Sequence, residues 1–393
     1  MLSFSQRLLR ELAIRLAQRV IPCHLATTQR EREAIARLRY EVHIREQNVA
    51  LSEADHDNRR IWYADDDRPD TLHFYAGSVD KMLGCARVRM WRPGQIPDDA
   101  RAFYSMDLLP DLSSLTVCDG TKLIMIPSLR GTTAMASLSG YSIYHTVSMY
   151  RNEAMFACCA PGLLRSYRAI GLRTFGGRLR HTDWGLVIPL IGITHDLEHT
   201  RRIGSPWYPA LQRLQAEGRL PQDLPAHRAR AEQDRSALTE PAELVPELDA
   251  FIRSGASPFL SALSLPARSQ LARYAMILDV PAGVCVTRQG VAERELFVVL
   301  KGEFAAFRGE RELCRMRRGE IFGEIALMSS TGQRQADVRA LTPGRVLVLR
   351  RKFLPQLSRT QPRIAIEIYQ ALTQELLGKL VASPAAADPR PTV

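Results

Sequence analysis

The chain lacks any apolar run of about 18 residues, the length that a membrane-spanning helix needs. Aromatic residues are also scarce, at 7% of the 393 residues. The seven cysteines are odd in number and show neither C-x-x-C spacing nor a nearby pair of histidines. This pattern argues against a disulfide framework and against a zinc site. We therefore expect reduced thiols, no metal and a cytoplasmic protein.

The remaining composition is typical of an ordinary folded protein, with 46% apolar and 24% charged residues. A chain of 393 residues is too long for one typical domain and suits two. The net charge of +11 would attract anionic partners, which include nucleic acid, acidic carrier proteins, phosphorylated cofactors and anionic lipid. Charge alone does not choose among them.

Residues 1–21 predict an amphipathic basic helix. Apolar residues recur there at helical spacing, with arginines between them: Phe4, Leu8, Leu12, Leu16 and Val20. The arginines interrupt any signal-peptide core and no small-residue cleavage site follows, so we do not expect export. Such a helix can pack on its own domain or lie on an anionic membrane surface. Peripheral contact with the inner membrane face is therefore one of two open expectations.

Helical and extended segments alternate from about residue 30 to 205, which predicts a mixed α/β sheet domain over residues 22–207. We expect helices at 30–46, 134–151 and 162–170, and strands at 73–77, 84–89, 122–126 and 155–160. Residues 208–254 are rich in proline, alanine and charge, and this composition predicts a linker with helical pieces such as 210–217.

From residue 255 onward, short β runs at 296–300, 303–307 and 345–349 are separated by glycines, which predicts a small β jelly roll. A last helix at 351–380 would close this domain of residues 255–380, and a tail at 381–393 would be disordered. The expected fold class is thus α+β.

A glycine turn followed by a short helix start marks this second domain. Phe322 to Ala340 reads F-G-E-I-A-L-M-S-S-T-G-Q-R-Q-A-D-V-R-A. Gly323 allows close approach of a ligand, and the residues after it would present N–H groups to an anion. Glu324 can accept a hydroxyl proton, and Arg334 can hold a phosphate with two parallel hydrogen bonds. The segment predicts a site for a ribose and a single phosphate.

This segment resembles the phosphate-binding cassette of the cyclic-nucleotide-binding domain family. Arg288-Gln289-Gly290, Glu295 to Gly302 (E-L-F-V-V-L-K-G) and Gly319 to Glu324 (G-E-I-F-G-E) follow the order and spacing of that family. The resemblance implies cAMP or cGMP as an allosteric ligand, with Glu324 on the ribose 2′-hydroxyl and Arg334 on the cyclic phosphate. The implied site residues are Gly323, Glu324, Ile325, Ala326, Arg334, Gln335 and Ala336.

Two departures from the family pattern leave the preferred base open: Gln333 replaces a common proline, and Gln335 replaces a small or hydroxylated residue. A barrel without ligand, in which Glu324 and Arg334 pair with each other, is the alternative. Many bacterial members carry a winged helix-turn-helix after the last helix. Only a short tail follows Leu380, so we expect no DNA-binding domain and a regulated activity upstream.

Lys122 to Met135 reads K-L-I-M-I-P-S-L-R-G-T-T-A-M, an apolar strand, a turn and a helix start. Amide groups at such a junction suit a pyrophosphate, and an arginine adds charge. A plain strand-to-helix turn explains the pattern equally well. The candidate residues for binding an acyl donor are Arg130, Gly131, Thr132 and Thr133.

Residues 163–172 read L-L-R-S-Y-R-A-I-G-L and resemble the tyrosine-x-x-x-glycine-hydrophobe ending of GNAT-fold acyltransferases. The resemblance implies that Tyr167 is a general acid that protonates the departing thiolate of the pantetheine arm. The alternative is a core tyrosine whose hydroxyl is satisfied by backbone.

Further segments resemble acyl-homoserine-lactone synthases and bacterial N-acyl amino acid synthases, which share the GNAT fold. They are Arg39-Tyr40-Glu41-Val42, the pair Asp55 and Asp57, Gly84-Cys85-Ala86-Arg87, Asp119-Gly120-Thr121-Lys122, and Asp196-Leu197-Glu198-His199 to Gly204-Ser205-Pro206. The resemblance implies transfer of an acyl group from acyl-CoA or acyl carrier protein to a small amine or amino acid.

In this interpretation Asp119 accepts the proton of the amine, directly or through water. It replaces a glutamate of the family, and the shorter side chain puts its reach in question. The candidate acceptor pocket consists of Arg39, Asp55, Asp57, Arg87 and Lys122, although a solvated ion-pair network would explain these residues equally well.

The sequence as a whole predicts a cyclic-nucleotide-regulated N-acyltransferase. One alternative is a protein-lysine acetyltransferase under cyclic-nucleotide control. Another is a first domain without catalysis that binds an acyl thioester as a sensor.

Overall fold

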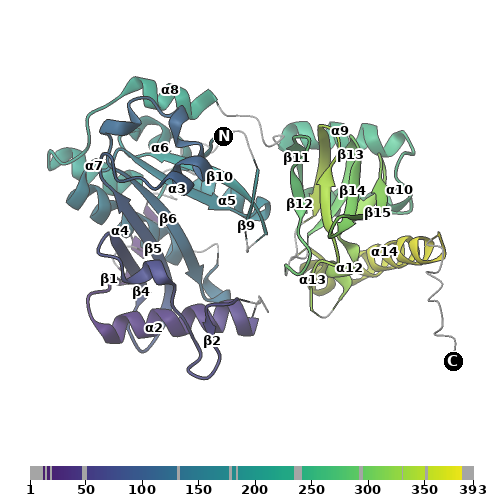
Figure 1. Ribbon diagram of the computed structural model, residues 1–393, viewed down its shortest axis with the longest axis horizontal. Coiled ribbons are helices and arrows are strands. Elements are labelled where there is room, and N and C mark those ends of the chain that lie inside the picture. Colours follow the sequence, from purple (N-terminus) through teal and green to yellow (C-terminus); the bar gives the residue numbers. More distant parts are fainter. Residues whose placement is uncertain are drawn as a thin grey trace. The chain divides into compact units, whose positions relative to one another are not determined.

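The computed structural model describes residues 12–13, 16–17, 20–46, 51–130, 133–176, 179–182, 185–233, 241–291, 295–329, 331–349 and 353–382. The chain divides into two compact units, residues 1–182 with 186–237 and residues 183–185 with 238–393 (Figure 1). Both mix helix and sheet. Most of the predicted helix 1–21, the tail from residue 383 onward, Gly131 and Thr132 lie outside the described residues. Across the described part of the chain, no helix combines the length and apolar character needed to cross a bilayer.

The first unit is built on one eight-stranded sheet (Figure 1). Its main path runs β1 (Cys23–Leu25), β4 (Thr71–Gly77), β5 (Met82–Trp91), β6 (Val117–Met125), β7 (Ala154–Cys159), β10 (Gly185–Ile193) and β8 (Arg173–Thr174), and β9 (Arg180–Thr182) pairs with β10. The pairs from β1 to β6 and from β7 to β8 are antiparallel, whereas β6 and β7 are parallel.

The parallel strands β6 and β7 part before either of them ends. Their pairing runs from Val117 with Ala154 to Gly120 with Ala157, and β6 then continues to Met125. Beyond the last pair, β6 bulges against β5 and Lys122 adopts a left-handed φ of 52°. Residues 120–123 are half-buried, while both ends of β6 are buried. One edge of β6 is therefore released from the sheet in its second half.

Helices of the first unit confirm most of the predicted ranges. They are α2 (Gln29–Tyr40), continued by the π-helix η1 (Glu41–Glu46), α3 (Asp98–Tyr104), α4 (Thr133–Tyr150), α5 (Leu164–Ile170), α6 (Leu197–Ile203), α7 (Tyr208–Ala216) and α8 (Pro225–Gln233). A capping box of Thr28 and Glu31 starts α2. Short elements include β2 (Ala54–Asp55), β3 (Arg60–Ile61) and the 3-10 turns η2 (Ala64–Asp67), η5 (Pro127–Leu129) and η6 (Pro161–Leu163).

The segment 208–254, which we expected to be a linker with helical pieces such as 210–217, contains three helices. Helix α7 packs against α4, where Trp207 Nε1 donates to Ser139 Oγ at 2.8 Å. Helix α8 belongs to the first unit, and α9 (Pro241–Arg253) belongs to the second, with Leu248 and Phe251 in its core. Pro209, Pro225 and Pro241 stand in the first turns of these helices, where proline is tolerated, and Pro246 lies inside α9.

The second unit is a sandwich of two four-stranded sheets with flanking helices, as the jelly-roll prediction required. One sheet has the order β11 (Ala275–Val280), β18 (Gly344–Leu349), β13 (Leu296–Lys301) and β16 (Ile321–Phe322). The other has the order β12 (Cys285–Thr287), β17 (Asp337–Ala340), β14 (Phe304–Arg308) and β15 (Arg311–Met316). Leu, Ile, Val and Phe side chains fill the core between the strands and the helices.

Helices α10 (Pro258–Ser261) and α11 (Leu265–Tyr274) precede this sandwich, and α12 (Glu324–Met328) lies within it. The single helix predicted at 351–380 is instead two, α13 (Phe353–Thr360) and α14 (Pro362–Ala382). Pro362 disfavours helical geometry at the residue before it, so the first helix ends there and a second begins.

Candidate functional site

A buried ion cluster joins α2, η2 and β5 in the first unit. Asp66 Oδ2 accepts from Arg39 Nη1 at 2.6 Å, and Asp66 Oδ1 accepts from Arg87 Nη1 at 3.1 Å. The side chains of Arg39 and Asp66 are fully buried, and Arg87 is 7% exposed. Arg87 Nε also donates to Thr121 Oγ1 at 3.0 Å. Two guanidinium groups thus share one carboxylate, which leaves a positive excess.

Tyr63 presents its ring to the same cations. Lys122 Nζ lies 3.9 Å from the ring centroid, and the guanidinium carbons of Arg39 and Arg87 lie 5.6 and 5.7 Å from it. Burial, reinforced by Arg87 and then Arg39, lowers the pKa of Lys122 to about 7. Burial also lowers the pKa of His73, beside Asp66, to about 4. A partly desolvated cationic site of this kind favours an anionic or carbonyl-bearing group.

The structure therefore brings together Arg39, Arg87 and Lys122 from the predicted acceptor pocket. Asp55 instead belongs to the exposed β2–β3 hairpin, where it accepts from the Asn58 backbone and from Arg60 Nε, each at 3.0 Å. The hydrogen bond from that backbone lowers the pKa of Asp55 to about 2. Asp57 is exposed on the same hairpin. The carboxylate that does contact the arginines, Asp66, was missed by the sequence analysis.

Asp119, the predicted general base, is fully buried on β6. Its Oδ2 accepts from Arg89 Nη2 at 2.5 Å, and its Oδ1 accepts from the Tyr104 hydroxyl at 2.6 Å. Burial, then the charge of Asp119, raises the pKa of Tyr104 well above its usual value, so the phenol stays protonated and donates. Both carboxylate oxygens already have partners. This geometry favours a structural role, and the catalytic role of Asp119 stays a prediction.

Tyr167, the predicted general acid, lies on α5 near the end of β7. Burial first, then Cys159 and Cys158, raises its pKa above the usual value. The phenol is therefore protonated at neutral pH, as a proton donor must be. Its neighbours Cys158 and Cys159 follow Ala157, the last β7 residue that pairs with β6. Tyr167 thus lies near the point where the two strands part.

Arg130, predicted to bind a donor phosphate, is held by protein groups. Its guanidinium pairs with Glu46 through two nitrogens, and its Nε donates to the Met125 carbonyl at 3.0 Å. Thr133 is the first residue of α4. The positive charge at this junction is thus balanced by Glu46, and a phosphate would have to compete with that carboxylate.

In the second unit, Gly323 connects β16 to α12 with a left-handed φ of 88°. A Cβ at this position would lie 2.4 Å from Arg334 Nη1 and 2.6 Å from the Glu295 carbonyl oxygen, so only glycine fits. Arg334 Nη1 donates to the Gly323 carbonyl at 3.2 Å. The guanidinium therefore rests on the backbone directly before Glu324.

Arg334 is 3% exposed and is fixed from several sides. Its backbone N–H donates to the Val291 carbonyl, and its own carbonyl accepts from Gly290, each at 2.9 Å. Its guanidinium lies 5.5 Å from the Phe297 ring centroid, and its Nη2 is 3.7 Å from Glu295 Oε2. The guanidinium is therefore fixed beside the glycine turn, and a guanidinium is suited to bind a phosphate with two parallel hydrogen bonds.

Glu324 is 4% exposed and contacts the last helix. Its Oε1 accepts from Lys379 Nζ of α14 at 2.9 Å, and the same ammonium donates to the Ile321 carbonyl at 2.6 Å. Glu324 is thus paired with Lys379, while Arg334 faces Glu295. Glu324 follows Gly323 in the chain and Arg334 donates to the Gly323 carbonyl, and each of these two side chains has a different charged protein partner.

The other predicted cassette residues surround these two. Ile325 is 49% exposed and Ala326 is buried, so α12 turns one side chain outward and one inward. Gln335 is exposed, and its Nε2 donates to the Gln333 carbonyl at 3.1 Å. The Ala336 carbonyl accepts from Thr287 Oγ1 at 3.3 Å.

Residues 277–361, which run from β11 into α13, match the family described as "Cyclic nucleotide-binding domain". The second unit contains a cyclic nucleotide-binding domain. The predicted resemblance of this half is thereby confirmed. The match does not extend to the first unit, whose acyltransferase interpretation stays a prediction.

Solved structures that resemble the chain include three bacterial proteins. A cyclic nucleotide-binding domain from Methylobacillus flagellatus is 22% identical, covers 31% of this chain and 70% of its own, and has a TM-score of 0.29. The N-terminal domain of a transcriptional regulator from Streptomyces coelicolor is 24% identical, with coverages of 34% and 96% and a TM-score of 0.28. The catabolite activator protein of Thermus thermophilus is 26% identical, with coverages of 32% and 61% and a TM-score of 0.28. A comparison with curated proteins gives no match.

Four residues of the first unit were not predicted from the sequence: Tyr63 and Asp66, which contact Arg39 and Arg87, and Arg89 and Tyr104, which contact Asp119. One signal was available: Arg87 and Arg89 are two residues apart on β5, so they share a face of the sheet with each other. The acidic run Asp65-Asp66-Asp67 offered possible partners. Among the described residues, no group of three or more His, Cys, Asp or Glu side chains could hold a metal ion.

Proposed function

We propose that this protein is a cyclic-nucleotide-regulated N-acyltransferase. A cyclic nucleotide, cAMP or cGMP, binds the second unit, with the ribose 2′-hydroxyl on Glu324 and the cyclic phosphate on Arg334. Its binding changes the rate at which the first unit transfers an acyl group from acyl-CoA or acyl carrier protein to a small amine or amino acid. The observation that carries the proposal is the burial of Glu324 and Arg334 around Gly323 inside a domain of the matching family.

The nucleotide side of the proposal rests on a buried guanidinium held at the glycine turn. Arg334 is nearly fully buried, its Nη1 donates to the Gly323 carbonyl, and its Nη2 lies 3.7 Å from Glu295 Oε2. A cyclic phosphate can accept two parallel hydrogen bonds from a guanidinium, which makes it a stronger partner. A ribose hydroxyl on Glu324 would share that carboxylate with Lys379, which donates to its Oε1. Nucleotide binding is thereby linked to the position of α14.

The transferase side rests on the parting of β6 and β7. The released edge of β6 suits an extended ligand that carries amide groups, such as the pantetheine arm, because such ligands can pair with a strand as peptides do. Tyr167, protonated and close to Cys158 and Cys159, is suited to protonate a leaving thiolate. The positive excess of the cluster of Arg39, Arg87 and Lys122 attracts a carboxylate on the acceptor through charge, since the side chain of Arg39 is fully buried.

Thiol release from a set of acyl-CoA and acyl carrier protein donors, measured with amino acid acceptors and with or without cAMP or cGMP, tests the proposal. We expect thiol release that depends on the acceptor and changes about five- to 150-fold with nucleotide, the usual range of coupling between sites. Activity that ignores the nucleotide for every donor would contradict the regulation.

One observation favours the sensor without catalysis as a second candidate: Asp119 is committed to Arg89 and Tyr104, which leaves the predicted base occupied. Donor binding without thiol release in the same experiment would select the sensor. Turnover of acetyl-CoA on protein substrates alone would select the protein-lysine acetyltransferase.

A further inference from the structure

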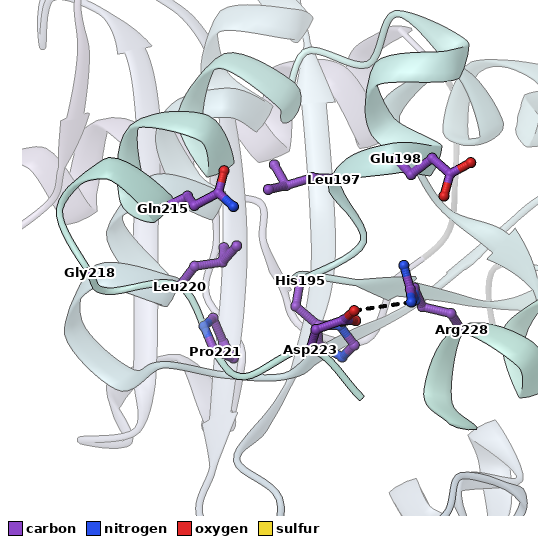
Figure 2. Close-up of a pocket in the computed structure, with 9 residues that line it drawn as sticks. All are labelled: His195, Leu197, Glu198, Gln215, Gly218, Leu220, Pro221, Asp223 and Arg228. Atoms are coloured by element: carbon purple, nitrogen blue, oxygen red, sulfur yellow. Dashed lines mark hydrogen bonds and ion pairs between the residues drawn. The ribbon is translucent and has the colours of Figure 1, made fainter. Parts of the chain in front are cut away.

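A pocket of about 440 Å³ lies on the first unit, between the turn after β10 and helices α6, α7 and α8 (Figure 2). Figure 2 shows Asp223 joined to Arg228, an ion pair of 3.0 Å. The His195 side chain is fully buried, and its Nδ1 lies 3.2 Å from Asp223 Oδ1. Asp223 and Arg228 are thus engaged with each other and the covered imidazole is out of reach, so the pocket does not identify a ligand. Residues 12–20 carry a stronger signal.

Leu12, Leu16 and Val20 form an apolar stripe on the first unit. They are four residues apart, the spacing that aligns side chains on one side of a helix. Residues 12, 13, 16, 17 and 20 are helical, and the Ile21 N–H donates to the Ala17 carbonyl at 2.8 Å, as in a helical turn. The three side chains of the stripe are 55%, 63% and 69% exposed, in chain order. The stripe therefore faces solvent.

This orientation is the reverse of that of an amphipathic helix on a folded domain, which turns its large apolar side chains toward the core. Here the small residue Ala17 is buried, at 7% exposure, while the leucines and the valine of the stripe point outward. Single exposed leucines are ordinary, but several aligned on one side of a helix form the kind of patch that marks a contact surface. The described part of the protein's own domain leaves the stripe uncovered.

The charge pattern of residues 1–21 selects a lipid surface as the partner of the stripe. The sequence places Arg7, Arg10, Arg15 and Arg19 among the apolar residues, against the single acidic residue Glu11. Anionic headgroups attract such arginines, while the apolar side chains enter the boundary between headgroups and acyl chains. A second copy of the same segment would instead bring like charges together, which is unfavourable. The segment is complementary to an anionic bilayer rather than to itself.

We propose that the apolar stripe docks the protein on the surface of an anionic lipid bilayer. Its three side chains insert at the level of the headgroups, and the arginines of the segment interact with lipid phosphates. The stripe ends at Val20, and β1 begins at Cys23, which pairs with Ala76 of β4. Because the connection between the stripe and the sheet is so short, docking holds the sheet of the first unit close to the membrane.

Co-sedimentation of the full-length protein with lipid vesicles tests the proposal. One set of vesicles is pure phosphatidylcholine, and the other contains about one third phosphatidylglycerol. We expect at least about tenfold tighter binding to the anionic vesicles, and weaker binding at about 0.5 M salt, which screens the headgroup charge. Leu16→Gln should weaken binding to anionic vesicles about tenfold, because one apolar side chain no longer enters the bilayer. The matched control is Leu265→Gln, at a 75% exposed leucine of α11, which should bind as wild type.

A second pair of variants tests the contribution of charge. Arg19→Gln should weaken binding to anionic vesicles about fivefold, since each basic residue near such a surface adds attraction. Arg92→Gln removes the same charge from an exposed position directly after β5 and should leave the affinity unchanged.

Three outcomes would overturn the proposal: no binding to either kind of vesicle, equal affinity for neutral and anionic vesicles, and equal affinity of wild type and Leu16→Gln. Sedimentation velocity and thermal unfolding without lipid test the other occupants of the stripe. A dimer that Leu16→Gln dissociates would assign the stripe to a second copy, and a clear loss of thermal stability in Leu16→Gln would assign it to the protein's own domain. Either result would also refute lipid docking. Because no nucleotide, donor or acceptor is present, these outcomes are independent of the transferase proposal.

Discussion

The guanidinium of Arg334 is almost wholly buried, and its contribution to nucleotide affinity depends on the anion that it contacts. We expect Arg334→Ala to remove micromolar binding of cAMP or cGMP, because one lost charge-assisted contact weakens a ligand about ten- to hundredfold, and a buried unpaired phosphate weakens it more. Calorimetric titration measures the affinity. Arg308→Ala, an exposed arginine at the end of β14, is the control and should bind as wild type. Equal affinity for wild type and Arg334→Ala would refute the role of Arg334.

Lys379 occupies the carboxylate that the ribose is proposed to use. Replacing it by methionine keeps much of the side-chain length and removes the competing ammonium, so we expect Lys379→Met to bind the nucleotide more tightly. Lys379 is 40% exposed, and a pair of that kind contributes little, so the gain should not exceed about fivefold. Lys301→Met, an exposed lysine on β13, serves as the comparison in the same titration. Weaker binding by Lys379→Met would show that Lys379 assists the ligand.

Lys122 should make stability depend on pH between about 7 and 10.5, the two limits set by its lowered pKa in the folded protein and its ordinary value. In that window the folded protein binds fewer protons at Lys122 than the unfolded chain does, so stability rises with pH. We expect the free energy of unfolding of wild type to rise relative to that of Lys122→Met as pH increases through this range.

Urea unfolding at several pH values measures this difference, and groups common to both proteins cancel. Lys81→Met, at an exposed lysine, should run parallel to wild type across the whole range. A parallel profile for Lys122→Met as well would mean that Lys122 titrates normally in the fold.

At the scale of elements, the turn between β16 and α12 sets the cassette geometry. Gly323→Ala should destabilise the second unit and weaken the nucleotide, because the added Cβ collides with Arg334 Nη1 and with the Glu295 carbonyl. Gly309→Ala is the matched control: its φ is also left-handed, at 60°, but a Cβ there meets nothing within 4 Å. It should cost only the left-handed penalty of about 1 kcal/mol. Thermal unfolding with and without nucleotide compares the two, and equal losses would contradict the steric argument.

The sequence predicted those helices and strands whose pattern of polar and apolar residues agrees with the way they are buried in the fold. Strand β13 and helix α4 lie within a residue or two of their expected bounds. Strand β10 was missed because Pro189 stands in its middle and its nine residues are all buried, so it has no polar–apolar alternation. Helix α7 agrees with the helical piece expected at 210–217, whereas α8 and α9 were missed because their first-turn prolines look like linker signals.

The cassette of the second unit and the ion cluster of the first unit also differ in how far the sequence could predict them. Glu324 and Arg334 were predictable because a short stretch of chain carries both around one glycine turn. The first-unit cluster joins Arg39, Asp66, Arg87 and Lys122 from four separate elements. Only the tertiary packing of a helix, a 3-10 turn and two strands brings these residues together, so a linear pattern could suggest three of them but not the carboxylate that they surround.

At the scale of the whole molecule, the two units carry separate chemistries, and regulation requires a free energy of coupling between them. Coupling between two binding sites is reciprocal: if the nucleotide changes the affinity for an acyl donor by a factor, the donor changes the affinity for the nucleotide by the same factor. We therefore expect the dissociation constant of cAMP or cGMP to shift about five- to 150-fold in the presence of saturating acyl-CoA, even where no acceptor is added and no turnover occurs.

Titrating nucleotide into full-length protein with and without acyl-CoA, and acyl-CoA with and without nucleotide, gives both factors. Their agreement is required by thermodynamics, so a mismatch would expose hydrolysis or incomplete saturation. If neither ligand changes the dissociation constant of the other, the two units bind their ligands independently. In Arg334→Ala the shift in acyl-CoA affinity caused by nucleotide should disappear, because the nucleotide then lacks its phosphate contact. A shift that persists in Arg334→Ala would place the effective nucleotide site outside the cassette.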